Sequence, residues 1–200
     1  MDEQEAAQSV YECLLAFGQQ ASNPVLAVIA GHDTLQSGRH YPEPYLSFAE
    51  QRLRAYYHSH SHPQQQEDEH GHFHLFANTG IGQACWTHLA ALSMDEQGQV
   101  KRWLSTNRWV TDECWQEAQM LTAFSLPPLE EESPLLERWL YSMVSLYRQE
   151  LMALWRRRDQ RLTEIKANSA ETDILQNTDH YILAEGDIAL LEKIQKVLQL

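Results

Sequence analysis

The sequence predicts an α+β fold: a central antiparallel sheet of about four to five strands, with N- and C-terminal helices that include one long helix. Alternating patterns occupy residues 50–106, and apolar residues repeat at helical spacing near the N-terminus and again over residues 111–200. A chain of 200 residues that is 43% hydrophobic suffices for one core. We therefore expect a single domain spanning residues 1–200.

The first 20 residues predict a helix, because Val10, Leu14 and Phe17 recur at helical spacing. The short apolar run at residues 25–30 is compatible with a strand or with a helical turn. Residues 31–45 are rich in glycine and proline and predict a loop.

Six of the ten histidines lie in two H-x-H-x-H runs, residues 58–62 and 70–74, which a polar and acidic stretch separates. If each run is a strand, its three histidines share one face, and an antiparallel hairpin brings the two sets together. Facing Cβ atoms in such a pair lie about 4.5–5.5 Å apart, which lets two or three imidazoles bind one ion. The candidate metal ligands are His58, His60, His70, His72 and His74.

Among these, His60, His72 and His74 are the leading ligands, and neutral imidazole suits a divalent transition metal such as Fe, Zn, Mn, Ni or Cu. Glu69 or Glu67 would complete a two-histidine, one-carboxylate site of the kind that binds non-haem iron. Three histidines with an open position would instead suit zinc-activated water. The alternatives are a metal-free catalytic or anion-binding role, and histidines that merely cover an exposed strand pair.

Two further strands are predicted at residues 85–94 and 99–106, with a turn signal between them. In the first of these, His88 is expected in phase with Trp86, Ala90 and Leu92. Earlier in the sheet, Tyr56 shares the face of His58 and either lines a pocket or belongs to the core.

The Asn107-Arg108-Trp109 element follows the last of these strands, where binding residues commonly occur. We expect Arg108 to orient a carboxylate or phosphate ligand near the metal, which makes Arg108 and Glu69 the candidate catalytic residues. The alternative for this element is a turn followed by a core tryptophan.

The C-terminal half is predicted to be mainly helical. One helix is expected from residue 111 or 112 to about 124. A continuous apolar stripe from Ser133 to Ile165 predicts one long helix that spans the domain or pairs with a protein partner or a second copy. A short strand at residues 180–184 and a helix at 188–198 complete the chain.

The composition excludes several classes of function. Fifteen basic and 28 acidic residues give 15 − 28 = −13, a charge that repels phosphate backbones and anionic membranes. There is no apolar run of about 18 residues, and the acidic start lacks the basic region of a signal peptide, so we expect a cytoplasmic protein. Phosphate-binding loops, dinucleotide fingerprints and hydrolase elbows are absent.

The three cysteines, Cys13, Cys85 and Cys114, are widely spaced and odd in number, and none belongs to a C-x-x-C pair. The spacing favours neither a disulfide framework nor a zinc finger. We expect three buried free thiols.

Three motifs together, Tyr57-His58-Ser59-His60, Glu69-His70-Gly71-His72-Phe73-His74-Leu75-Phe76 and Thr106-Asn107-Arg108-Trp109-Val110-Thr111, resemble an uncharacterised bacterial family, a domain of unknown function. The resemblance extends from about residue 50 to Asp159 and implies no activity. The H-x-H element is also similar to that of cupins, but the cupin glycine spacing is missing and long C-terminal helices are foreign to a small β-barrel.

The histidine pattern thus predicts a metal-dependent enzyme that acts on a small polar substrate. The alternative is a non-catalytic metal-binding accessory module, whose long helix docks a partner.

Overall fold

A computed structural model describes residues 1–32, 34–59, 68–80, 85–168 and 173–200. Within these ranges, one antiparallel sheet contains six strands that are neighbours in chain order, which is slightly more than the predicted four to five. The strands are β1 (Tyr41–Phe48), β2 (Leu53–His58), β3 (Gly71–Asn78), β4 (Trp86–Met94), β5 (Val100–Thr106) and β6 (Ile182–Asp187). The helices are α1 (Glu3–Gln19), α2 (Pro24–Val28), α3 (Arg108–Thr111), α4 (Ala118–Ala123), α5 (Leu135–Leu146), α6 (Arg148–Asn168), the 3-10 turn η1 (Ile174–Gln176) and α7 (Leu190–Leu198).

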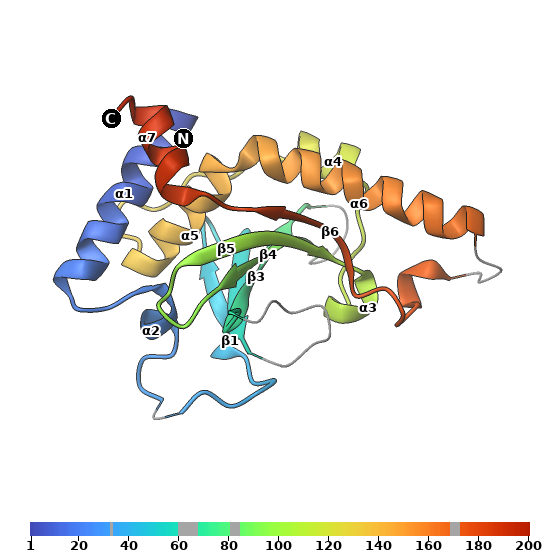
Figure 1. Cartoon of the computed structure of the whole chain (residues 1–200), viewed down its shortest axis with the longest axis horizontal. Coiled ribbons are helices and arrows are strands. Elements are labelled where there is room, and N and C mark those ends of the chain that lie inside the picture. Colours follow the sequence, from blue (N-terminus) through green and yellow to red (C-terminus); the bar gives the residue numbers. More distant parts are fainter. Residues whose placement is uncertain (33, 60–67, 81–84, 169–172) are drawn as a thin grey trace.

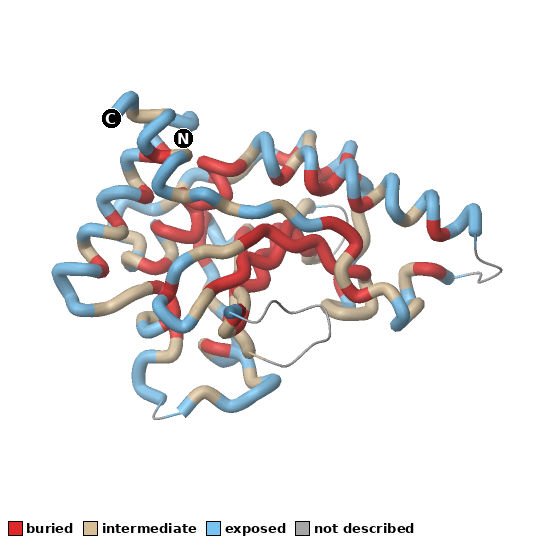
Figure 2. Tube along the Cα trace, in the orientation of Figure 1, coloured by how far each residue is buried: buried red, intermediate tan, exposed pale blue. Residues whose placement is uncertain are grey.

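Helices from both ends of the chain share one hydrophobic core with the sheet, in keeping with the α+β prediction. Helix α6 runs along β5 and β6, while α1 contacts both α5 and α7, so the two termini lie side by side (Figure 1). Buried residues line the inner turns of these helices and the middle of the sheet (Figure 2). None of the helices in the described ranges combines the length and the apolar character needed to cross a bilayer.

The N-terminal helix forms as predicted, and a capping box fixes its start. Asp2 accepts a hydrogen bond from the Glu5 amide, and the Glu5 carboxylate accepts one from the Asp2 amide. Val10, Cys13 and Phe17 then form the buried stripe of α1. Residues 25–30, for which strand and helix were both open, contain the short helix α2.

The predicted loop at residues 31–45 is wrong in its last part, because β1 begins at Tyr41. Pro42 and Pro44 lie inside this strand. β1 is the first strand of the sheet and pairs only with β2, so its outer edge needs no amide donors. An edge strand accepts proline for this reason, whereas a central strand does not.

The single long helix predicted from Ser133 to Ile165 is two helices, α5 and α6, which are separated at Tyr147. The apolar stripe continues through both helices. Nearly all of α5 is buried, and it contacts α1 and α2, whereas α6 buries one side against β5 and β6. A pattern that continues across the break hides the break from sequence reasoning. The helix expected from residue 111 is likewise replaced by α3, a segment at residues 112–117 that is neither helix nor strand, and the short α4.

The prediction of three free thiols is wrong for two of them. Cys85, just before β4, forms a disulfide with Cys114 in the 112–117 segment, and their Cα atoms are 5.4 Å apart. The two residues are 29 positions apart, and no local motif announces a pairing that depends on tertiary structure. Cys13 is the buried free thiol among the described cysteines.

Gly71, the first residue of β3, has no room for a side chain. A Cβ atom at this position would lie 2.5 Å from the His58 carbonyl oxygen and 2.6 Å from the Tyr57 hydroxyl oxygen. We expect Gly71→Ala to lower the free energy of unfolding by about 1–3 kcal/mol, as overpacking does. Urea unfolding followed by circular dichroism measures this change.

Gly18→Ala is the matched control, because nothing lies within 4 Å of a Cβ atom at this helical position. It should raise the free energy of unfolding by about 0.5–1 kcal/mol. Equal stability of Gly71→Ala and wild type would contradict the close approach at Gly71.

Candidate metal centre

The pairing of β2 with β3 brings three histidines together on one face of the sheet. His58 lies opposite His72, and Tyr56 lies opposite His74. Side chains of directly paired residues share a face, as do residues two apart in one strand. The Nε2 atom of His58 consequently lies 2.9 Å from His72 Nε2 and 3.0 Å from His74 Nε2.

These distances fit coordination of one ion better than they fit hydrogen bonding. A neutral imidazole nitrogen carries either one proton or one lone pair, so His58 Nε2 cannot form full hydrogen bonds with both neighbours. Two nitrogens that are each about 2.1 Å from an ion are about 3.0 Å apart at a right angle and about 3.4 Å apart at a tetrahedral angle. The three histidines form a group that can hold a metal ion, with their ligand atoms within 4.8 Å of one another.

His88 joins this face through a β-bulge in β4. Leu75 of β3 pairs with Ala90, but the next residue, Phe76, pairs with His88, so Leu89 is the extra residue. The prediction that His88 is in phase with Ala90 and Leu92 is therefore wrong. The bulge turns His88 to the histidine face, and no sequence pattern revealed it.

His88 lies directly behind His74. His74 Nδ1 is 3.0 Å from His88 Nε2, and His88 Nδ1 is 3.4 Å from the Thr106 hydroxyl. When the lone pair of His74 Nε2 points at the centre, its Nδ1–H is the donor to His88. Burial, and secondly the charge of Arg158, lowers the pKa of His88 to about 3, so its ring is neutral and able to accept.

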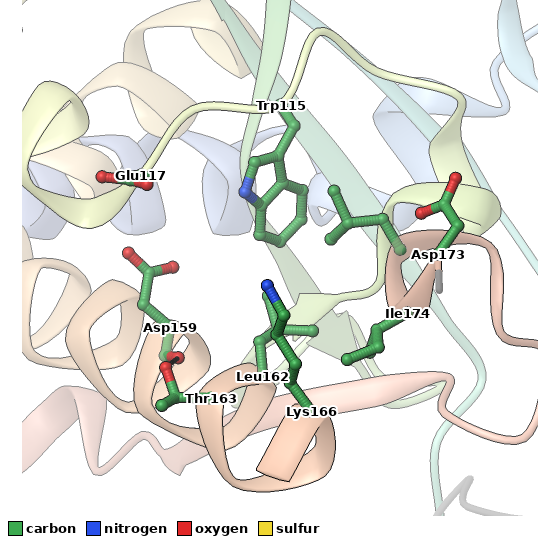
Figure 3. A pocket seen from close by; sticks show the side chains of 9 residues that line it. Trp115, Glu117, Asp159, Leu162, Thr163, Lys166, Asp173 and Ile174 are labelled. Atoms are coloured by element: carbon green, nitrogen blue, oxygen red, sulfur yellow. Dashed lines mark hydrogen bonds between the residues drawn. The ribbon is translucent and has the colours of Figure 1, made fainter. Parts of the chain in front are cut away.

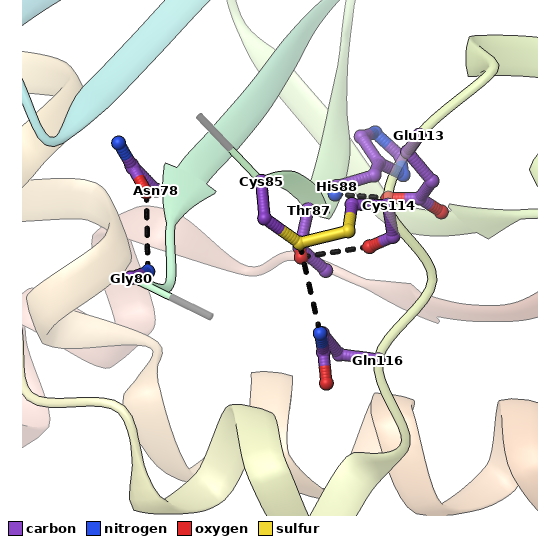
Figure 4. The surroundings of a disulfide bond; sticks show 8 residues. All are labelled: Asn78, Gly80, Cys85, Thr87, His88, Glu113, Cys114 and Gln116. Carbon is purple, nitrogen blue, oxygen red and sulfur yellow. Dashed lines mark hydrogen bonds between the residues drawn. A yellow bond between two sulfur atoms is a disulfide. The ribbon is translucent and has the colours of Figure 1, made fainter. Parts of the chain in front are cut away.

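Near His88, the backbone groups at the edge of β4 form hydrogen bonds with side chains and with the 112–117 segment instead of with β5. The pairing of β4 with β5 begins only at Ala91. Before that point, Trp86 accepts a hydrogen bond from the Cys114 amide, and the His88 amide donates to the Glu113 carboxyl group (Figure 4). The Leu89 carbonyl accepts from the Trp155 indole at 2.6 Å.

Aromatic rings flank the three histidines. The Tyr56 ring lies 5.6 Å from the His58 ring and 5.2 Å from the His74 ring. The His40 ring stacks on the Tyr56 ring, with 3.9 Å between the two ring centres. Burial raises the pKa of Tyr56 to about 12, so its phenol stays protonated. Tyr56 therefore borders the candidate centre.

Glu69 lies beside the histidines but is engaged elsewhere. Its two carboxylate oxygens each accept a hydrogen bond of 2.8 Å from the Arg102 guanidinium, and Ser93 donates to the same carboxylate. Arg102 also pairs with Glu185. Glu69 thereby fastens the residues before β3 to β4 and β5.

The other predicted ligands are not in the converging set. His70 precedes β3, where strict alternation ends, and its Nδ1 lies 2.7 Å from the Tyr57 hydroxyl. His60, together with Glu67 and His62, lies outside the described residues.

The Asn107-Arg108-Trp109 element fastens the C-terminal segment to the end of β5. The Asn107 amide donates to the Ile174 carbonyl, and the Trp109 indole donates to the His180 carbonyl, both at 2.9 Å. Arg108 begins α3 and lies 3.5 Å from Asp173. These contacts give Asn107 and Trp109 a structural task, but Trp109 is only partly buried and is not the core tryptophan of the alternative.

A separate cavity of about 580 Å³ lies between the 112–117 segment, α6 and η1 (Figure 3). None of the three converging histidines lines it. Its Asp159 carboxylate already binds the Ala118 amide and the Arg158 guanidinium, and Arg158 lies 4.1 Å from the centre of the Trp115 ring. Because these charged groups are already paired with the protein, we propose no ligand for this cavity.

An antiparallel sheet with converging imidazoles on one face defines an α+β protein with a histidine group able to hold a metal. The chain belongs to the family described as Domain of unknown function (DUF6969), whose profile matches residues 4–188. The predicted resemblance to a domain of unknown function is thus confirmed over more of the chain than expected. No curated protein matches the chain. No solved structure matches it either.

The buried Glu113 carboxyl group predicts a pH-dependent stability. Burial raises its pKa from 4.5 to about 8, although the His88 amide, Arg158 and Arg108 oppose the shift. Between these values the folded chain keeps a proton that the unfolded chain releases. This contribution to stability is full below pH 4.5 and is lost as the pH rises to 8, by about 1.4 kcal/mol per pH unit.

Glu113→Gln keeps the acceptor oxygen and does not titrate. We expect the free energy of unfolding of this variant, relative to wild type, to increase between pH 5 and pH 9 in urea titrations. Parallel pH profiles for the two proteins would show that Glu113 is not a buried neutral acid.

Proposed function

We propose that this protein binds a divalent transition-metal ion through His58, His72 and His74 and uses it to act on a small polar substrate. The observation that carries the proposal is the approach of three Nε2 atoms, with His58 Nε2 at 2.9 and 3.0 Å from the other two. Three imidazoles suit Fe, Zn, Mn, Ni or Cu.

The ligand set supports an enzyme because three protein ligands leave coordination positions open. A bound divalent ion supplies Lewis acidity or an activated water molecule. His74 is fully buried, whereas His72 is partly exposed, so the group has a solvent-facing side. The Tyr56 ring lies beside the His58 and His74 rings, and its protonated phenol is the proposed hydrogen-bond donor for a substrate.

Arg54 supports an anionic group on that substrate. It lies on the same face of β2 as Tyr56 and His58, with its Cα atom about 13 Å from that of His58. Its guanidinium carbon is 4.5 Å from the centre of the Trp86 ring and 4.8 Å from that of Phe76. In the described part of the chain no carboxylate pairs with it, although the protein carries a net charge of −13.

Catalytic roles for Glu69 and Arg108, and metal binding by His60 and His70, stay predictions. A non-catalytic accessory module remains the second candidate, and so does a partner or second copy on the long helix, α6. The apolar residues of α6 pack against β5 and β6 of the same chain, so that side of the helix is already covered and serves the fold instead of a partner.

Metal titration tests the ligand set. Tag-free protein should bind one divalent ion per chain in isothermal titration calorimetry, with the content checked by elemental analysis. His58→Ala, His72→Ala and His74→Ala should each weaken binding by more than about 100-fold, because each removes a direct ligand.

His32→Ala, at an exposed loop residue, is the control and should leave the affinity unchanged. His60→Ala and His70→Ala in the same assay test the two remaining predicted ligands. Failure of the wild type to bind any divalent ion would refute the proposed function.

Azide binding separates an enzyme from an accessory module. If the bound ion keeps an open position, azide added to the Co²⁺-loaded protein should shift its visible absorption bands in a saturable manner. A spectrum that does not respond to azide would favour the non-catalytic module.

A further inference from the structure

The Cys85–Cys114 disulfide lies next to the groups that hold His88. Cys85 immediately precedes β4, and Cys114 directly follows Glu113. The Glu113 carboxyl group accepts a hydrogen bond from the His88 amide (Figure 4). The Thr87 hydroxyl also donates to the Cys114 carbonyl at 2.8 Å. The bond therefore joins the two segments at the position where His88 is fixed.

The 112–117 segment has little regular structure of its own. Helix α3 ends at Thr111 and is followed by Asp112 in a left-handed conformation, and α4 starts only at Ala118. Residues 113 and 114 take the place that β5 leaves beside β4, through the Cys114 amide and the Glu113 carboxyl group. The disulfide is the covalent link that keeps this replacement for a strand in position.

A continuous series of contacts connects this segment to the candidate centre. Glu113 accepts a hydrogen bond from the His88 amide, and His88 Nε2 lies 3.0 Å from His74 Nδ1. His74 Nε2 in turn is one of the three converging nitrogens. A partner behind a metal-binding imidazole fixes its orientation and its tautomer.

We infer that Glu113 and the Cys85–Cys114 disulfide position the metal-binding face through His88, so that metal affinity depends on whether the disulfide is closed. The inference rests on the proposed function and names a way to regulate the same site. Cys114 is exposed and therefore open to attack by a dithiol.

The chemical step is thiol–disulfide exchange. One thiolate of a dithiol attacks a sulfur of the disulfide and forms a mixed disulfide, and the second thiolate then displaces the remaining cysteine. The dithiol loses two electrons and becomes a cyclic disulfide, while Cys85 and Cys114 gain the two electrons and each end with one proton. The 112–117 segment is then free of its covalent link to β4.

The affinity should fall on reduction, because an unlinked segment no longer holds Glu113 against the His88 amide. Loss of such a supporting contact typically weakens metal binding by about 10–100-fold. The same loss is expected when the carboxyl group is removed while the disulfide stays closed.

The experiment compares Zn²⁺ affinity in three samples of the full chain: oxidised, reduced with dithiothreitol and desalted without oxygen, and the double variant Cys85→Ser/Cys114→Ser. Alkylation followed by mass spectrometry counts the thiols, and circular dichroism checks the fold. The reduced protein and the double variant should bind about 10–100-fold more weakly than the oxidised protein. The double variant excludes zinc binding by the released thiols, and Cys13→Ser should respond to reduction as the wild type does.

Two further variants test the positioning role with the disulfide intact. Glu113→Ala should weaken Zn²⁺ binding by about 10–100-fold, whereas Glu113→Gln, which keeps the acceptor oxygen, should bind like the wild type. A merely structural role would change stability in both variants without this difference in affinity.

Equal Zn²⁺ affinity in the oxidised, reduced and double-variant samples, with reduction confirmed, would overturn the inference alone. Absence of Zn²⁺ binding in the oxidised sample would overturn the proposed function and the inference with it. The two failures are therefore distinguishable in one data set.

Discussion

The pairing of β2 with β3 is the constraint on which the site depends. Their register places His58 opposite His72, and a shift of one residue would turn both imidazoles to the other face of the sheet. Burial fixes this register, because Tyr57 and Phe73, which alternate with these histidines, are completely buried in the core. The packing of the core on one face of the sheet thus determines where the histidines lie on the other face.

The histidine face is supported by buried polar contacts on both sides. Near the hairpin, the Glu69–Arg102 pair fastens the chain before β3, with both side chains 4% exposed. Deeper in the sheet, His88 stands behind His74 and is itself held by Glu113. Buried groups of this kind are costly unless they are paired, which accounts for the contacts around each of them.

Sequence periodicity predicted the antiparallel sheet, the hairpin and the shared face of His58, His72 and His74, since alternation is a local property. It failed where tertiary contacts decide. The bulge at Leu89 depends on pairing with β3, and the Cys85–Cys114 bond depends on the path of a segment 29 residues away. The helix break at Tyr147 was missed because the apolar pattern continues across it. Strand β1 was missed because Pro42 and Pro44 indicated a loop, although an edge strand tolerates them.

These features make the central claim a statement about coordination: three imidazole nitrogens share one ion. X-ray absorption spectroscopy of the protein loaded with one equivalent of Zn²⁺ tests it most directly. The account predicts a first shell that contains three imidazole nitrogens at about 2.0–2.1 Å together with the multiple-scattering signature of the rings. A first shell made of oxygen or sulfur, or one with fewer than two imidazoles, would contradict it.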